Sequence, residues 1–379
     1  MADNKIQDDF ELLSKMMEDM RSTHAFYRPT NYWKTYEAGS IDYLKTHGLR
    51  DFRSYNTNRL ASFAAGTYRG APLLSRYREL IEYRGLGESS LIAIMFEIYT
   101  RILNRFSKRF DLINIKKFSV YEEYYLQEIR ELQNLQYRHC KLLDRISGLN
   151  ILDHIEDLAV GNPCDLFQIN ERYYTVAFLR YFEQMAYISM NLNFNKISSV
   201  IEIGSGYGGC VEVFVKAFPR ITYFNFDIPP QVYVAQQYLS AIFPGQVYTY
   251  KNLLSNEKID TKKYRIVCLP TWALELISGI NFDLFINSAS FQEMEKDVVE
   301  NYYSLIKDKV KWAYLFELTH GSYRKTSEIS GGCVEPLKIS DLISIFRDFE
   351  IVAQDQFYRI QHPHTHLILK RMGQINNLI

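Results

Sequence analysis

Four glycines follow a short apolar segment that ends near an acid. Residues 199–209 read SVIEIGSGYGG, so Glu202 precedes glycines at 204, 206, 208 and 209. The spacing Gly204-x-Gly206-x-x-Gly209 matches the fingerprint of dinucleotide sites. The spacing Glu202-x-Gly204-x-Gly206-x-Gly208 is typical of loops that bind S-adenosylmethionine (SAM). Glycines in either loop allow positive φ and a close approach of backbone to ligand. The two patterns predict different chemistry, hydride transfer in one case and methyl transfer in the other.

Two acids favour SAM over a dinucleotide. Glu202 suits the cationic amino group of SAM and would oppose an anionic pyrophosphate, which dinucleotide folds place at the helix N-terminus. Asp227 ends the second predicted strand, 23 residues after Gly204, where its carboxylate can accept both hydroxyls of a ribose in either kind of fold. A glycine turn without any ligand is the third interpretation, and it leaves both acids unexplained.

Candidate groups for proton transfer follow the fourth and fifth predicted strands. Methylation of a hydroxyl needs a base that removes its proton. Glu293, in the segment INSASFQEMEKD, is the first candidate base, and Gln292 would orient the acceptor hydroxyl. His320 is the rival base, and Arg324 nearby would bind an anionic sugar or a phosphate. The alternatives are a helix-terminal acid for Glu293 and a solvated loop for His320 and Arg324.

Three histidines alternate near the C-terminus, at positions 362, 364 and 366. On a strand they would share one face, which raises the alternative of a metal site. Pro363 interrupts the run, and hard cations prefer carboxylates. We therefore predict no metal site.

Two patterns of secondary structure divide the chain. Residues 1–190 are predicted to form a helical domain that supplies the acceptor pocket, a lid and oligomer contacts, with helical patterns over 7–22, 89–110, 120–146 and 174–192. Residues 191–379 alternate strand and helix, which predicts an α/β Rossmann-like sheet that is mostly parallel, with seven strands and an antiparallel last strand. The predicted strands are 198–203, 221–227, 264–270 (with 246–251 as a competitor), 281–290, 311–318, 350–358 and 364–371. Helices lie between them, the last one with Ser340 as its cap.

Composition excludes several classes of protein. Lys plus Arg and Asp plus Glu both number 44, so we expect no nucleic-acid partner, because such proteins usually carry a basic excess. Five scattered cysteines predict reduced thiols and a cytoplasmic location. The polar N-terminus resembles no secretory signal, and the longest apolar run, 91–96, is too short to span a membrane.

The chain resembles the bacterial family of sugar O-methyltransferases, within the class I SAM-dependent methyltransferases. The matching stretches span most of the chain and include YWKTYEAGSIDYLKTHGLRDFRS at 32–54, GNP at 161–163, LRYFEQ at 179–184, IEIGSGYGG, FDIPPQVYVAQQYLSAIFPG, CLPTW, FDLFINSASFQEM and THLIL. The segment DIPP…YLS followed by N-x-x-SFQEM is the most specific part. In O-methyltransferases of the plant phenolic type, a His-Asp pair stands where this chain has Gln292-Glu293.

The resemblance implies roles for further residues. The methionine end of SAM would contact Glu202, Gly204, Gly206 and Gly208, and Asp227 would bind the ribose. The remaining cofactor contacts would come from Tyr181, Gln184, Ile228, Leu269, Pro270, Thr271 and Asn287. Trp33 and Arg53 lie in the family-like N-terminal stretch and would bind the sugar acceptor.

These observations predict an enzyme that transfers a methyl group from SAM, leaving S-adenosylhomocysteine, to a hydroxyl of a sugar or of a sugar-bearing glycan precursor. Two alternatives stay open. One is methylation of another small molecule, such as a phenolic or polyketide product, and the other is a non-catalytic partner protein with the same fold. Self-association into a homo-oligomer is a further open alternative.

Overall fold

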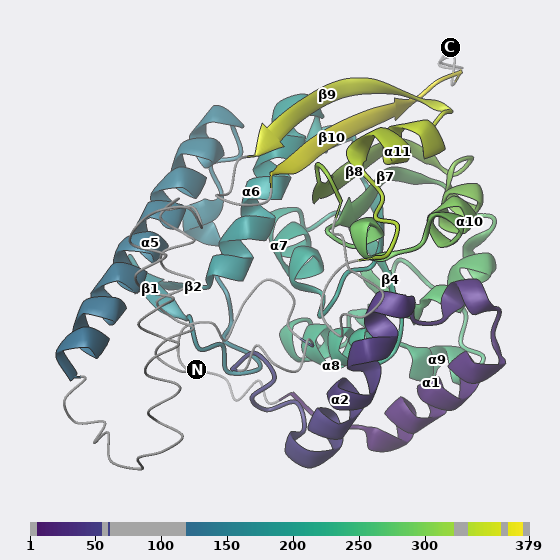
Figure 1. The fold of residues 1–379 in the computed structure, drawn as a ribbon, viewed down its shortest axis with the longest axis horizontal. Helices are drawn as coiled ribbons and strands as arrows, with labels where there is room; N and C mark the ends of the chain where they lie inside the picture. Colours follow the sequence, from purple (N-terminus) through teal and green to yellow (C-terminus); the bar gives the residue numbers. More distant parts are fainter. Residues whose placement is uncertain (1–5, 55–59, 61–118, 322–332, 358–362, 374–379) are drawn as a thin grey trace.

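The computed structural model of the 379-residue chain describes residues 6–54, 60, 119–321, 333–357 and 363–373. An eight-stranded sheet forms its centre, in the order β5-β6-β4-β3-β7-β8-β10-β9, and helices flank it (Figure 1). The strands are β3 (Ser199–Ile203), β4 (Thr222–Asp227), β5 (Val247–Tyr248), β6 (Ile266–Pro270), β7 (Phe282–Ser288), β8 (Val310–Leu318), β9 (Phe349–Phe357) and β10 (His364–Arg371).

The sheet has the predicted fold class. The six strands β3 to β8 all pair in parallel. Strand β10, the last strand of the chain, lies antiparallel to both β8 and β9. The central strand β7 is buried at every position, as expected of a parallel strand covered on both faces. Strand number differs from the prediction of seven. Both competing segments form strands, since β6 occupies the predicted third place and the two-residue β5 adds an edge beside it.

Helices of the C-terminal half connect these strands. They are α7 (Gly209–Ala217), α8 (Gln231–Ile242), α9 (Tyr250–Leu254), α10 (Lys296–Ile306) and α11 (Ile339–Ile345), with 3-10 turns η4 (Phe194–Lys196), η5 (Thr271–Ile277) and η6 (Phe291–Glu293). The expected cap of the last helix was wrong. Lys338 is the N-cap of α11, and the side chain of Asp341 accepts its backbone N–H at 2.9 Å.

The N-terminal half is helical where the structure describes it. Its helices are α1 (Phe10–Ser22), α2 (Asn31–His47), α5 (Ser119–Ile146) and α6 (Val176–Asn191), with 3-10 turns η1 (Ala25–Tyr27) and η3 (Leu152–His154) and a hairpin of β1 (Phe167–Ile169) and β2 (Arg172–Tyr174). Asp9 is the N-cap of α1 and its carboxylate accepts the Leu12 N–H, and the helix buries a stripe of leucines and methionines. Helix α2 was not predicted, although turn residues bracket it. The predicted helix over 89–110 lies outside the described residues.

Helices α1 and α2 lie beside α8 and α9 of the C-terminal half (Figure 1). The Asp9 N–H donates to the Tyr233 hydroxyl of α8 at 2.8 Å, and the Tyr27 hydroxyl donates to Glu275 at 2.9 Å. The two halves therefore share contacts along the side of the sheet. A domain boundary near residue 190 stays a prediction.

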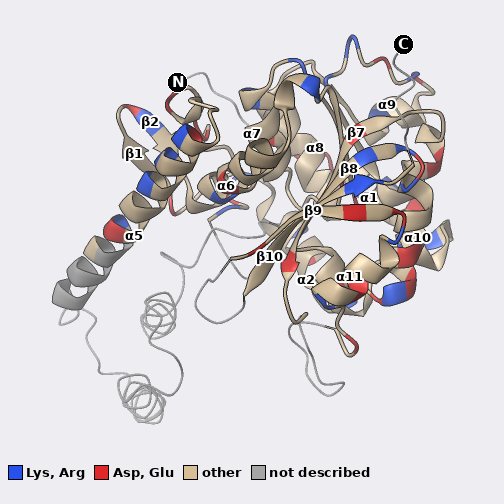
Figure 2. Ribbon diagram, turned by 90° about the horizontal axis from the view of Figure 1, so that it is seen from above, with Lys and Arg blue, Asp and Glu red and all other residues tan. Residues whose placement is uncertain are grey.

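The charged residues and the cysteines are distributed as follows. Basic and acidic residues are interspersed along helices such as α5 and α10 (Figure 2). All five cysteines are free thiols, four of them buried. Among the described helices, none is long and apolar enough to cross a membrane.

Candidate active site

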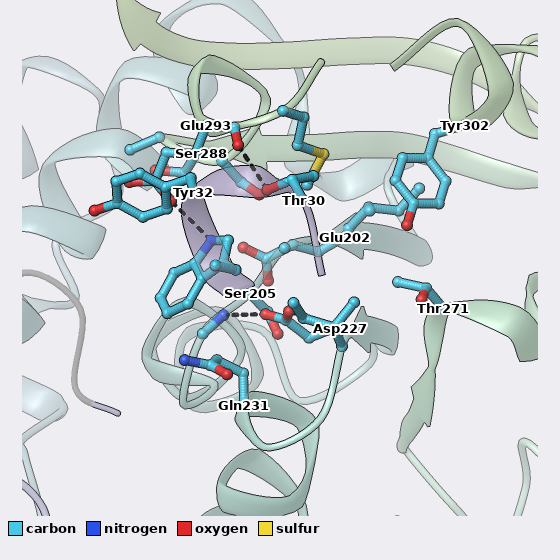
Figure 3. A pocket seen from close by; sticks show the side chains of 18 of the residues that line it. Thr30, Tyr32, Glu202, Ser205, Asp227, Gln231, Thr271, Ser288, Glu293 and Tyr302 are labelled. Atoms are coloured by element: carbon cyan, nitrogen blue, oxygen red, sulfur yellow. Dashed lines mark hydrogen bonds between the residues drawn. The ribbon is translucent and has the colours of Figure 1, made fainter. Parts of the chain in front are cut away.

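A cavity of about 220 Å³ lies at the carboxyl ends of β3, β4, β6 and β7 (Figure 3). Strand ends and the loops that follow them meet at this edge in parallel sheets, which is where such folds bind ligands. Its lining comes from both halves of the chain: Arg28, Thr30, Tyr32, Trp33, Tyr181, Glu202, Ile203, Gly204, Ser205, Gly206, Asp227, Ile228, Gln231, Thr271, Ser288, Ala289, Ser290, Gln292, Glu293, Met294, Val298 and Tyr302.

The glycine loop forms one wall of the cavity. Gly204 and Gly206 line it with φ of 78° and 59°, a region that disfavours residues with a Cβ. A Cβ on Gly204 would also lie 1.9 Å from the Ser290 hydroxyl oxygen. Gly208 is outside the lining and is the N-cap of α7, which begins at Gly209. Positive φ and close packing thus explain why residues 204, 206 and 208 are glycines. Of these three, only Gly204 and Gly206 line the cavity.

Both predicted acids reach this wall. Glu202 at the end of β3 is buried and accepts the Tyr223 hydroxyl at 2.8 Å. Burial raises the pKa of Glu202 to about 8, because removal from water disfavours the charged form. Asp227 at the end of β4 accepts the N–H of Gly206 and of Ile228, each at 2.7 Å. Its burial raises the pKa of Asp227 to about 7.

The lining fits SAM. Glu202 would offer a carboxylate to the ammonium group and Asp227 one to the ribose, and both line the cavity together with Ile228 and Thr271. The hydroxyl oxygens of Ser205 and Ser288 are buried in the lining of this cavity and have no hydrogen-bond partner among the described residues. Buried polar atoms normally have partners, so a ligand rich in polar groups suits this cavity.

A loop after β7 forms the opposite wall, and Glu317 of β8 holds it from behind. The fully buried Glu317 carboxylate accepts the N–H of Ser290 at 3.3 Å and of Gln292 at 3.1 Å. The Gln292 amide oxygen accepts the Leu318 N–H at 2.7 Å. Asn287 bridges this loop to β3, since its amide donates to the Ile203 carbonyl at 2.7 Å and accepts the Phe291 N–H at 3.0 Å.

Glu293 projects into the cavity and contacts the N-terminal half. The Trp33 indole N–H donates to the Glu293 Oε2 atom at 3.1 Å, and the Thr30 hydroxyl donates to the Glu293 carbonyl at 2.9 Å (Figure 3). Residues more than 250 positions apart in the chain thus meet at the candidate base.

The structure brings together ten predicted residues in the cavity wall: Trp33, Tyr181, Glu202, Gly204, Gly206, Asp227, Ile228, Thr271, Gln292 and Glu293. Others lie outside the lining. His320 is exposed on the turn after β8, and its role as the rival base stays a prediction. The buried residues outside the lining are Gln184, Leu269, Pro270 and Asn287. The Asn287 amide donates to the Ile203 carbonyl. Arg324 lies outside the described residues.

Arg53 is the clearest correction. We expected it to bind the acceptor, but it is fully buried and outside the lining. Its two terminal nitrogens pair with the two carboxylate oxygens of Asp157 at 3.0 and 2.6 Å. The guanidinium also lies 5.2 Å from the ring centroid of Tyr207, in the glycine loop. Arg53 therefore supports that loop from behind.

The alternating histidines have structural contacts. His364 stacks on Phe316, and the buried His366 hydrogen-bonds the Tyr314 hydroxyl at 2.8 Å. They share a face of β10, as the spacing predicted. His362 lies outside the described residues. Among those described, no group of three candidate ligands could hold a metal ion.

Sequence reasoning missed several lining residues. Tyr32, Ser205 and Gln231 lie inside quoted stretches, so their positions were a usable signal. Thr30 precedes α2 and Tyr302 lies on α10, and nothing in their local pattern indicates a cavity.

Comparison with known proteins agrees with this geometry. Residues 182–259 match the family model of the O-methyltransferase domain. The matched segment contains the glycine loop and Asp227. A search of curated proteins finds no match.

Several solved structures are similar to part of this chain. The pyocyanin biosynthetic protein PhzM is 12% identical, with 49% of this chain and 58% of that chain covered and a TM-score of 0.33. The mitomycin 7-O-methyltransferase MmcR is 15% identical, with 51% and 57% covered and a TM-score of 0.33. The N-terminal domain of EvdMO1, solved with S-adenosylhomocysteine, is 10% identical, with 61% and 95% covered and a TM-score of 0.34. The alignments to PhzM and MmcR span little more than half of those chains.

Proposed function

We propose that this chain transfers the methyl group of SAM to a hydroxyl of a sugar or of a sugar-bearing glycan precursor in the cytoplasm, with Glu293 as the general base. One observation carries the proposal. The two acids of the predicted cofactor wall and the carboxylate of Glu293 face the same cavity of about 220 Å³.

On the cofactor side, Glu202, Gly204 and Gly206 would hold the methionine end, and Asp227 would hold the ribose. When bound, SAM supplies an electrophilic methyl group. The protein excludes water by enclosing the site between the glycine loop and the loop after β7, and such enclosure strengthens the electrostatic interactions inside.

On the acceptor side, Glu293 accepts the proton of the hydroxyl as it becomes a nucleophile. The Gln292 amide oxygen is bonded to the Leu318 backbone, so its amide N–H donors are the groups that would orient the acceptor. Tyr32 and Trp33 add aromatic surface. Such surface suits a sugar face, and it suits a phenolic ring equally well.

Calorimetry with S-adenosylhomocysteine tests the cofactor half of the proposal. We expect binding in the micromolar range or tighter, lost in Asp227→Ala and retained in Glu293→Gln, because only Asp227 is assigned to the ribose. If the intact protein does not bind S-adenosylhomocysteine, the proposed function is wrong.

A panel of sugars, nucleotide sugars and phenols with labelled SAM tests the acceptor half. We expect methylation of a sugar and its loss in Glu293→Gln. Methylation confined to phenols would replace the sugar with a phenolic acceptor. Binding without methylation of any acceptor would favour a non-catalytic partner protein.

A further inference from the structure

The start of helix α2 is docked on the loop that carries Glu293. Thr30 is the N-cap residue of α2, yet its side chain makes no capping hydrogen bond within the helix. An N-cap threonine normally accepts a backbone N–H of the first turn, which stabilises the helix by about 1 kcal/mol. Here the hydroxyl donates instead to the Glu293 carbonyl at 2.9 Å.

A second hydrogen bond joins the start of α2 to the same loop. The backbone N–H of Asn31, at the first position of α2, donates to the carboxylate of Glu295 at 3.1 Å. The unsatisfied N–H groups and the positive dipole at a helix N-terminus favour such a carboxylate. The active-site loop therefore caps α2, and α2 in return fixes the loop at residues 293 and 295.

The third contact reaches the reacting group itself. Trp33, on the first turn of α2, donates its indole N–H to the Glu293 Oε2 atom at 3.1 Å. Two tyrosines hold the indole ring edge-on, Tyr32 with centroids 5.4 Å apart and Tyr36 with centroids 6.1 Å apart. The indole nitrogen can only donate a hydrogen bond. It therefore binds the ionised carboxylate of Glu293 more strongly than the protonated carboxyl group.

From these contacts we propose that Trp33 and Thr30 are positioning residues for Glu293, which orient its carboxylate and favour its proton-accepting form. This inference rests on the proposed role of Glu293 as the base. It gives Trp33 an action through Glu293 in addition to the expected contact with the acceptor. The N-terminal half then completes the reaction centre as well as enclosing it.

The indole N–H signals of the full chain provide a test that needs no acceptor. The chain has three tryptophans, so spectra of ¹⁵N-tryptophan-labelled protein are simple, and Trp33→Phe assigns the signal of Trp33. We expect this signal to shift with pH as Glu293 titrates, because the hydrogen bond strengthens when its acceptor is ionised. Glu293→Gln should abolish that shift, and Lys34→Ala, an exposed neighbour on the same helix, should leave it unchanged.

Thr30 variants test the backbone contact. Thr30→Val should broaden or move the Trp33 signal, whereas Thr30→Ser, which keeps the hydroxyl, should restore it. A Trp33 signal whose chemical shift changes neither with pH nor in Glu293→Gln would overturn the inference.

Kinetics on an acceptor identified by the panel add a second readout. Trp33→Phe should lower kcat/KM by roughly tenfold and move the acid limb of the pH profile to higher pH, since a hydrogen bond to the charged form of an acid favours that form. Binding of S-adenosylhomocysteine should stay unchanged. An unshifted acid limb would mean that Trp33 is only structural, whereas full activity of Glu293→Gln would reject the base and leave the cofactor site intact.

Discussion

Cofactor binding should depend on pH through Glu202. Burial raises the pKa of this carboxyl to about 8 in the protein alone, so most molecules carry it protonated at neutral pH. The ammonium group of S-adenosylhomocysteine favours the ionised carboxylate and lowers the pKa of Glu202 in the complex. Binding below about pH 8 must then release a proton, and the affinity must fall as the pH falls.

The magnitude follows from the pKa of the unliganded carboxyl. With a pKa of about 8, about one molecule in a hundred carries an ionised Glu202 at about pH 6, and about half do at about pH 8. The affinity should therefore weaken by about fiftyfold between these values, or about 2 kcal/mol. Asp227, with a pKa of about 7, adds a shallower dependence, because a ribose hydroxyl can also donate to or accept from a neutral carboxyl.

Calorimetry at several pH values, in two buffers of different ionisation enthalpy, measures both the affinity and the proton released. Glu202→Gln is the matched variant, because it keeps the shape and removes the titration. It should bind more weakly at about pH 8 and lose most of the pH dependence. An affinity that is equal at both ends of this range, with no proton released, would refute the assignment of Glu202 to the ammonium group.

Two further substitutions test the supports of the glycine loop. Gly204→Ala places a Cβ 1.9 Å from the Ser290 hydroxyl oxygen at a φ of 78°, so we expect a lower melting temperature and loss of S-adenosylhomocysteine binding. Gly279→Ala, where nothing lies within 4 Å, should change neither, and normal binding by Gly204→Ala would contradict the close packing of this wall. Arg53→Met leaves a buried carboxylate unpaired, so it should cost about 3–5 kcal/mol of unfolding free energy, measured by chemical denaturation. Arg50→Met, which removes an exposed ion pair, should cost about 1 kcal/mol or less, and equal losses in the two variants would show that the buried pair adds little.

Local sequence was enough to bring two acids and two glycines together in the lining of one cavity. Glu202, Gly204 and Gly206 lie within five residues, and their relative placement depends only on a strand that ends in a turn. Asp227 ends the neighbouring strand β4, which pairs in parallel with β3. Parallel strands bring their carboxyl ends to one edge, so these residues meet whatever the rest of the chain does. The alternation of strands and helices predicted the sheet for the same reason, because hydrophobic periodicity is a local signal.

Only the tertiary structure decided the rest of the site. Arg53 was expected to bind the acceptor, but it is buried, and the carboxylate of Asp157, more than 100 residues away, offsets the cost of burying its charge. Glu293 was recognised as an acid, yet its partners Thr30 and Trp33 come from a helix that the local pattern did not reveal. Such contacts depend on how remote elements pack against one another, and a single sequence does not encode that packing in any local pattern. The amino-acid sequence by itself therefore determined the fold class and the glycine-loop side of the cavity, while packing between distant segments decided which side chains surround Glu293.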